Sequence, residues 1–178
     1  TFAVRARFVL LRDLGSSLSP TNSFNFIQGL ETLPLRFRVH QENAEKVAHY
    51  LNSHPQVSKV IYPNLHDNDE DRNRTKKYLT KGSGPLVGFE LKDGKNAGQQ
   101  FIDNLKLIYH VANIGDARTL AIHPATTTHS QLSEEDQLKA GVTPGYVRLA
   151  VGLEYIDDII EDIDQALNNI NTTDQKVA

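Results

Sequence analysis

The chain has 178 residues, of which 39% are hydrophobic and 23% are charged, a balance typical of a globular domain that buries its own core. Its formal net charge of −3 provides no basic footprint for nucleic acid, and no apolar run is long enough to span a membrane. Cysteine is absent, which excludes disulfides, thiolate catalysis and cysteine metal sites and fits a cytoplasmic protein. Methionine is absent even at position 1, so we expect an excised piece, a processed product or a proteolytic fragment of a longer chain.

The first third of the chain is predicted to be helical. A helix over residues 3–15, ended by Gly15, is apolar on most sides, which predicts burial against something larger. A second helical stretch runs from Ser19 to about Asn52, and Pro34 predicts a kink or a break within it.

Short strands and helices mix without strict alternation in the rest of the chain. Strands are expected over residues 57–62, 86–91, 108–112, 119–122 and 146–152. Helices are expected over residues 71–79, 95–105, 134–139 and 156–170. This order indicates an α+β fold, a mostly antiparallel sheet with helices on one face. We therefore divide the chain into a helical linker (1–52), an α+β domain (53–170) and a polar tail (171–178).

Arg148 is the first candidate for a binding residue. It lies in an alternating strand that turns Val147 and Leu149 inward, so its guanidinium is expected on the polar face. Arginine suits carboxylate binding because its planar fork matches the carboxylate and never loses its charge. Alternation alone favours a plainer interpretation, in which Arg148 is a solvated partner in a surface ion pair.

Other polar residues also have plain interpretations. Asn113 precedes Ile-Gly and is typical of a turn, and Arg118 is expected to be a surface charge. His123 and His129 are spaced widely enough for metal ligands, but no carboxylate lies between them, so we expect hydrogen-bonded turn residues and no metal site. The acidic pairs at residues 157–158 and 161–162 are expected on the solvated outer face of the last helix.

Several motifs, in order along the chain, carry a resemblance to a known family. They are LRDLG (11–15), QGLETLPLR (28–36), NIGDARTL (113–120), HPATTTH (123–129), YVRLAVG (146–152) and GLEYIDDII (152–160). From residue 1 to about residue 167, the chain resembles the C-terminal part of the transsulfuration enzymes, which use pyridoxal phosphate. Within that family it most resembles the O-acetylhomoserine sulfhydrylase branch. The resemblance implies the small C-terminal domain of a fold-type I enzyme, preceded by linking helices.

The resemblance also implies roles for three residues. Arg148 matches the arginine that binds the α-carboxylate of the amino-acid substrate, and Thr128 is expected near this carboxylate-binding pocket. Asn113 stands where many relatives have a serine that helps to bind this carboxylate, and the sulfhydrylase branch commonly has asparagine there. Arg118 stands where the lyase and synthase branches often have glutamate, which again favours the sulfhydrylases.

The chain lacks the family's chemical centre. The lysine that carries pyridoxal phosphate lies in a Ser-x-Thr-Lys stretch upstream of the position matching Thr1, and no such stretch occurs here. We therefore expect the isolated chain to bind no cofactor and to be inactive.

For the full-length enzyme, the resemblance implies a homotetrameric transferase of methionine biosynthesis. It would replace the acetate of O-acetyl-L-homoserine by sulfide or a thiol, giving homocysteine or methionine. This chain's partner would then be its own N-terminal cofactor-binding domain. The alternatives are a cystathionine γ-synthase or γ-lyase relative, or a non-catalytic packing domain.

Overall fold

A computed structural model of the chain describes residues 1–66 and 68–171. Contacts divide the chain into two compact units, residues 1–36 and residues 37–178. None of the helices formed by the described residues combines the length and the apolar content needed to cross a bilayer.

The first unit is helical, as its apolar pattern predicts. The helix before Gly15 has three parts, α1 (Phe2–Arg5), a π-helical stretch (Ala6–Leu11) and α2 (Arg12–Leu14). Gly15 ends it with a φ of 68°, a left-handed conformation that glycine adopts without a steric penalty. Helix α3 (Pro20–Glu31) begins at Ser19, whose hydroxyl accepts a hydrogen bond from the backbone N–H of Asn22 at 3.1 Å.

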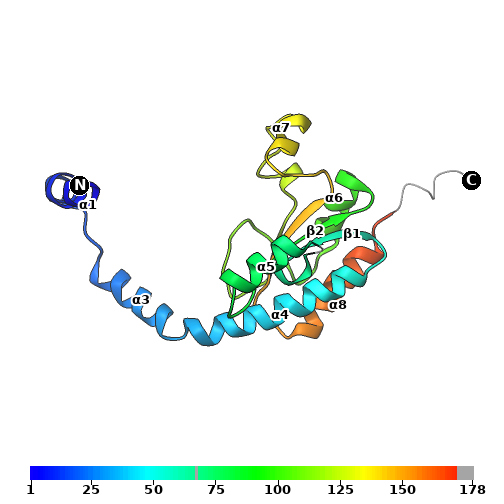
Figure 1. Cartoon of the computed structure of the whole chain (residues 1–178), viewed down its shortest axis with the longest axis horizontal. Coiled ribbons are helices and arrows are strands. Elements are labelled where there is room, and N and C mark those ends of the chain that lie inside the picture. The colour runs from blue at the N-terminus through cyan, green and yellow to red at the C-terminus, as the bar shows by residue number, and fades with distance from the viewer. Residues whose placement is uncertain (67, 172–178) are drawn as a thin grey trace, which may run out of the picture. The chain divides into compact units, whose positions relative to one another are not determined.

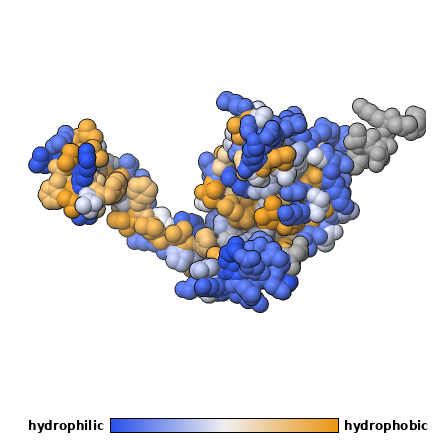
Figure 2. Space-filling model, turned by 45° about the horizontal axis from the view of Figure 1, so that its top comes forward, coloured by the Kyte–Doolittle hydropathy of each residue, from blue (hydrophilic) through white to orange (hydrophobic). Residues whose placement is uncertain are grey.

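Large apolar side chains of this unit are exposed in the chain as it stands (Figure 2). They include Phe2, Val4, Phe8, Leu14, Phe24, Phe26, Ile27 and Leu30. An isolated domain rarely presents so much contiguous apolar surface, so this unit has the character of an interface.

Helix α4 (Leu33–Ser53) follows the break predicted near Pro34. Its second half buries Ala44, Val47, Ala48 and Leu51 in the core of the second unit. The contact boundary after Arg36 therefore lies earlier in the chain than the boundary after residue 52 that the sequence favours.

The second unit is built on a five-stranded sheet. The strands are β1 (Val57–Ile61), β2 (Leu86–Leu91), β3 (Tyr109–His110), β4 (Leu120–Ile122) and β5 (Tyr146–Ala150). Their order is β1-β2-β5-β4-β3, and every neighbouring pair is antiparallel except β3 and β4. This confirms the α+β fold and the mostly antiparallel sheet, while β3 and β4 are shorter than predicted.

Three helices cover one face of this sheet. Helix α6 (Gly94–Asn104) and helix α8 (Ile156–Asn168) pack with α4 against the inward side chains of β2 and β5 (Figure 1). The inward side chains are Val87, Phe89, Leu91, Val147 and Leu149. Helix α5 (Asp69–Tyr78), helix α7 (Glu134–Lys139) and the 3-10 turns Pro63–Leu65 and Pro124–Thr126 complete the unit.

One acidic residue of α8 contradicts the prediction. Asp162 is only 5% exposed, whereas the sequence placed it on the solvated face of this helix. Its carboxylate accepts hydrogen bonds from the backbone N–H groups of Lys106, Leu107 and Ile108, each at 2.9 Å. Helical spacing shows which residues share a face, but it does not show that a neighbouring loop covers that face. The predicted tail begins at residue 171, and residues 172–178 lie outside the described part of the chain.

Candidate functional site

Strand β5 carries Arg148 on the face of the sheet that the three helices do not cover. Arg148 lies opposite Gly88 of β2 on one side and Ile122 of β4 on the other. Gly88 leaves room for the ring of Tyr146, because a Cβ at position 88 would lie 2.8 Å from that ring. Burial under these neighbours raises the pKa of the Tyr146 phenol, so Tyr146 stays neutral beside the arginine.

The guanidinium of Arg148 is only partly satisfied by the protein. Its Nη2 donates a hydrogen bond to the carbonyl oxygen of Ala112 at 2.7 Å. Its Nε is buried and has no hydrogen-bond partner within residues 1–66 and 68–171. A buried donor without a partner costs free energy, so the protein's own groups leave this guanidinium incompletely satisfied.

The carbonyl that Arg148 contacts belongs to the wall of a small hollow. The hollow has a volume of about 250 Å³ and is lined by His110, Val111, Ala112, Ile122, Thr127 and Thr128. Ile122 is also the strand neighbour of Arg148. Thr128 lines this hollow, and Arg148 reaches its wall through the hydrogen bond to Ala112 and lies opposite Ile122 in the sheet.

Asn113 and Arg118, two further residues singled out in the sequence, are not among the residues that line this hollow. Asn113 directly follows Ala112 and is exposed. Arg118 is also exposed, and its guanidinium stacks 4.7 Å from the ring centre of Tyr109. This contact gives Arg118 a cation–π partner on β3, in keeping with the predicted surface role.

The segment after β4 is held by His123, which is fully buried. Its Nε2 lies 2.8 Å from the carbonyl oxygen of Pro144, and its Nδ1 lies 2.8 Å from the hydroxyl of Thr126. A carbonyl can only accept, so Nε2 carries the proton and Nδ1 accepts from Thr126. Burial lowers the pKa of His123 and keeps the imidazole neutral.

This geometry matches the predicted turn role of the histidines. Both ring nitrogens of His123 are engaged, and the backbone carbonyl of His129 accepts from Gln137 at 2.8 Å. The described residues contain no group of three or more His, Asp or Glu side chains arranged to hold a metal ion.

His110 lines the hollow beside Ala112, and no pattern in the sequence indicated it as a site residue. Its position just before the Asn113 turn was the available signal. Periodicity could not reveal it, because β3 is only two residues long.

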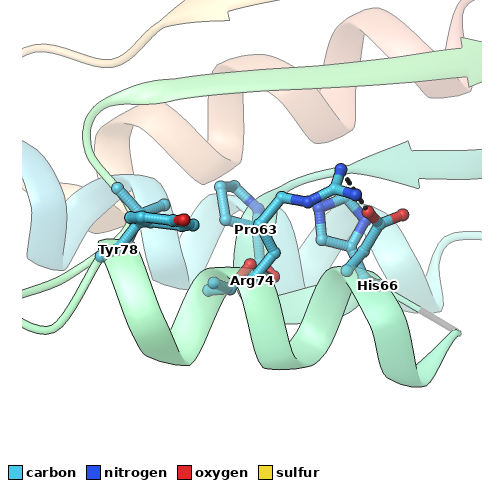
Figure 3. Close-up of a pocket in the computed structure, with 7 residues that line it drawn as sticks. Pro63, His66, Arg74 and Tyr78 are labelled. Atoms are coloured by element: carbon cyan, nitrogen blue, oxygen red, sulfur yellow. Dashed lines mark hydrogen bonds and ion pairs between the residues drawn. The ribbon is translucent and has the colours of Figure 1, made fainter.

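A second hollow, of about 440 Å³, lies along helix α5 (Figure 3). Its walls include Pro63, His66, Arg74 and Tyr78. The guanidinium of Arg74 pairs with Glu70 at 2.6 Å and with Asp71 at 3.2 Å. Because the chain's own carboxylates already neutralise this arginine, this hollow is a weaker candidate for an anionic ligand than the hollow beside Arg148.

The residues around Arg148 do not fit a pyridoxal phosphate site. Such a site needs a lysine for the Schiff base, an acidic partner for the ring nitrogen and a phosphate cradle. The hollow beside Arg148 is lined by apolar, threonine and histidine side chains, with neither lysine nor carboxylate among them.

Comparison with protein families gives a match to the Cys/Met metabolism PLP-dependent enzymes over residues 2–168. The chain belongs to this family. Similar curated proteins include the O-acetyl-L-homoserine sulfhydrylase of Leptospira meyeri, 52% identical over 95% of the chain. The O-acetyl-L-homoserine sulfhydrylase 1 of Thermus thermophilus is 48% identical over 93% of the chain. The chain spans 38% and 39% of the lengths of these two relatives.

Two solved structures share the fold. A putative O-acetylhomoserine (thiol)-lyase from Campylobacter jejuni superposes with a TM-score of 0.84 at 47% identity, over 94% of this chain and 40% of that one. The cystathionine gamma-lyase of Lactobacillus plantarum, complexed with L-serine, superposes with a TM-score of 0.81 at 34% identity, over 96% of this chain and 44% of that one. The α+β unit is therefore the C-terminal fold of fold-type I pyridoxal-phosphate enzymes.

Proposed function

We propose that the chain is the C-terminal, substrate-binding part of an O-acetylhomoserine sulfhydrylase. The full-length enzyme would replace the acetate of O-acetyl-L-homoserine by sulfide or a thiol, so that a C–O bond breaks and a C–S bond forms. The products would be acetate and homocysteine, or methionine when methanethiol is the donor. The sulfhydrylases among the relatives, at 48% and 52% identity, support this choice of substrate.

The single observation that carries the proposal is the partly satisfied guanidinium of Arg148. Its buried Nε has no partner in the described part of the chain, while its Nη2 is fixed by Ala112. An arginine whose guanidinium is oriented by the protein but not fully paired suits the α-carboxylate that every amino-acid substrate of this family shares. Asn113 and Thr128 would supply further polar contacts from the two turns beside it.

In this proposal Arg148, Asn113 and Thr128 bind and orient the substrate and make no bonds themselves. Holding the carboxylate fixes the direction of the rest of the amino acid relative to the reacting groups. Orientation of this kind lowers the barrier by removing rotational and translational freedom before the reaction. The reacting lysine and the cofactor would come from the N-terminal domain of the same protein.

The exposed apolar side chains of the first unit support that domain partner. Phe2, Phe8 and Phe24 are each at least 60% exposed, and a preceding domain would cover them. We further propose that the complete enzyme is a cytoplasmic homotetramer, as the family resemblance implies.

The test is a steady-state assay of the full-length protein with O-acetylhomoserine and sulfide. We expect homocysteine and acetate in equal amounts. Preferential turnover of cystathionine, or its synthesis from cysteine, would instead assign a γ-lyase or γ-synthase. No turnover of any of these substrates would favour a non-catalytic packing domain.

A further inference from the structure

We propose that Glu154 and Thr119 form a latch that positions the substrate-binding segment, residues 111–118. This inference rests on the proposed function, because it assigns the latch a part in binding the substrate carboxylate. Both residues lie outside the hollow beside Arg148, so they are positioning residues and do not touch the substrate.

The latch consists of charge-assisted hydrogen bonds around a buried threonine. Thr119 is 0% exposed, and Glu154 accepts from it with both carboxylate oxygens. Oε1 accepts the backbone N–H of Thr119 at 2.7 Å, and Oε2 accepts its hydroxyl at 2.8 Å. The same hydroxyl oxygen accepts the backbone N–H of Gly152 at 2.8 Å. The hydroxyl of Thr119, the single polar group of its side chain, thus both donates and accepts. Hydrogen bonds to a carboxylate are stronger than those between neutral groups.

The two segments approach too closely for a side chain at position 152. A Cβ on Gly152 would lie 2.4 Å from the backbone of Arg118 and Thr119. The backbone N–H of Leu153 donates to the carbonyl oxygen of Ala117 at 2.8 Å. The end of the 111–118 segment is therefore clamped onto the chain that leaves β5.

Helix α4 holds the other half of the latch in place. The side-chain amide of Asn43 donates to the carbonyl oxygens of Gly152 and Glu154, at 3.1 and 3.0 Å. His40 donates from Nδ1 to the carbonyl oxygen of Val151 at 2.7 Å. Since His40 and Asn43 are both buried, the backbone that carries Glu154 is held in a fixed position relative to helix α4.

The latch matters to the binding site because of what the 111–118 segment carries. It includes Asn113, and it includes Ala112, whose carbonyl oxygen accepts the hydrogen bond that fixes Arg148. The chain leading into β3 is held by the Asp162 carboxylate, and the exit from the segment is held by Glu154. Releasing the exit would let Asn113 and the Ala112 carbonyl move, and Arg148 would lose its fixed direction.

A merely structural role for the latch predicts a different result from a positioning role. Loss of a structural contact lowers the melting temperature and the yield of folded protein but leaves KM unchanged in the molecules that fold. Loss of a positioning contact raises KM for the amino-acid substrate in folded molecules. The sulfur donor does not share the carboxylate contact, so its KM provides an internal reference.

The experiment compares three threonine variants in the full-length holoenzyme. Thr119→Val keeps the shape but removes the hydroxyl, and we expect KM for O-acetylhomoserine to rise roughly tenfold, with KM for sulfide within about twofold of wild type. Thr119→Ser restores the hydroxyl and should bring KM to within about threefold of wild type. Thr143→Val is the matched control, because the Thr143 hydroxyl is buried with no partner in residues 1–66 and 68–171. It should leave KM unchanged.

Glu154→Gln provides a second variant if Thr119→Val fails to fold, and it should raise the same KM. Hydrogen–deuterium exchange of amides 112–118 should quicken in Thr119→Val and recover in Thr119→Ser. A folded Thr119→Val protein with the wild-type KM would overturn the proposal. Unchanged exchange of these amides in both Thr119→Val and Glu154→Gln would also overturn it. If wild type does not turn over O-acetylhomoserine at all, the proposed function fails by itself, and exchange alone then decides whether the latch holds the segment.

Discussion

His123 shows how a single buried side chain can fix a turn beside the candidate site. Both of its nitrogens are engaged, by Thr126 and by the Pro144 carbonyl, and burial lowers its pKa. The imidazole is neutral in the fold but titrates near its ordinary pKa of about 6.5 when the chain unfolds. This difference makes the stability of the protein depend on pH.

We predict that the free energy of unfolding decreases as the pH falls from 7.5 to 5.5. Above the unfolded pKa both states are neutral at His123, so no proton is exchanged on unfolding. Below it the unfolded state binds a proton that the fold resists, and unfolding becomes easier. His123→Gln should be less stable at pH 7.5 but should lose less stability on acidification. Urea unfolding of both proteins at the two pH values measures this, and equal losses would exclude His123 as a source of the dependence.

Helix α6 packs its Gly98 directly against the same imidazole. A Cβ at position 98 would lie 2.4 Å from Nε2 of His123, whose ring is held by two hydrogen bonds. The helix therefore uses a glycine in its interior, although alanine would favour the helix itself by about 1 kcal/mol.

Gly98→Ala should lower the free energy of unfolding by about 1–3 kcal/mol, because overpacking outweighs the gain in helix propensity. The exposed neighbour Gln99 provides the control, since Gln99→Ala changes the same helix without meeting His123. Chemical denaturation of the two variants gives the comparison. Stabilisation by Gly98→Ala would mean that His123 can move aside at no cost.

The sequence predicted those elements whose pattern is local. Alternation in β2 and β5 and the apolar spacing in α8 gave the right elements, since each pattern repeats over several residues. Alternation puts Ala150 on the same face as Arg148, where the structure buries it to 5% exposure between its strand partners in β2 and β4. Strands β3 and β4 are too short for a pattern, and a parallel pairing between them has no sequence signal.

The candidate site was predicted only in part, and for a related reason. Arg148 could be named from its residue type, strand face and family motif. Its contact with the Ala112 carbonyl joins residues 36 positions apart, and no local rule predicts it. The role of Glu154 depends likewise on Thr119, 35 positions away, so only the three-dimensional fold reveals the latch.

At the scale of the whole molecule, the length of the chain and the surface of its first unit set it apart from a self-contained domain. It spans 38% of the length of the Leptospira meyeri sulfhydrylase, and its first unit exposes a series of phenylalanine and leucine side chains. Its second unit has a well-packed core of its own. We therefore expect the second unit to carry the fold and the first unit to carry the connection to the cofactor-binding domain.

The isolated chain should not retain pyridoxal phosphate. It lacks the Ser-x-Thr-Lys stretch, and the hollow beside Arg148 contains no lysine. After mixing with the cofactor and desalting, we expect no stoichiometric visible absorbance band, whereas the full-length protein should show one. A stoichiometric band that reduction traps on a single lysine of this chain would contradict the proposal that the N-terminal domain holds the cofactor.

The most direct test of the central claim is the steady-state kinetics of Arg148→Lys in the full-length enzyme. Lysine keeps the positive charge but loses the planar fork, so the change separates geometry from charge. Losing one charge-assisted hydrogen bond should cost about 1.5–3 kcal/mol, or about one to two decades in kcat/KM. The matched control is Arg72→Lys on α5, where the side chain is 49% exposed and pairs with Asp69.

We predict that Arg148→Lys loses this factor for every amino-acid substrate, independently of the sulfur donor, while its cofactor absorbance stays that of wild type. Arg148→Ala should lose more, because it leaves the carboxylate unpaired. Arg72→Lys should match wild type in every respect. Wild-type kcat/KM for O-acetylhomoserine in Arg148→Lys would contradict the account and leave Arg148 as a structural partner of Ala112.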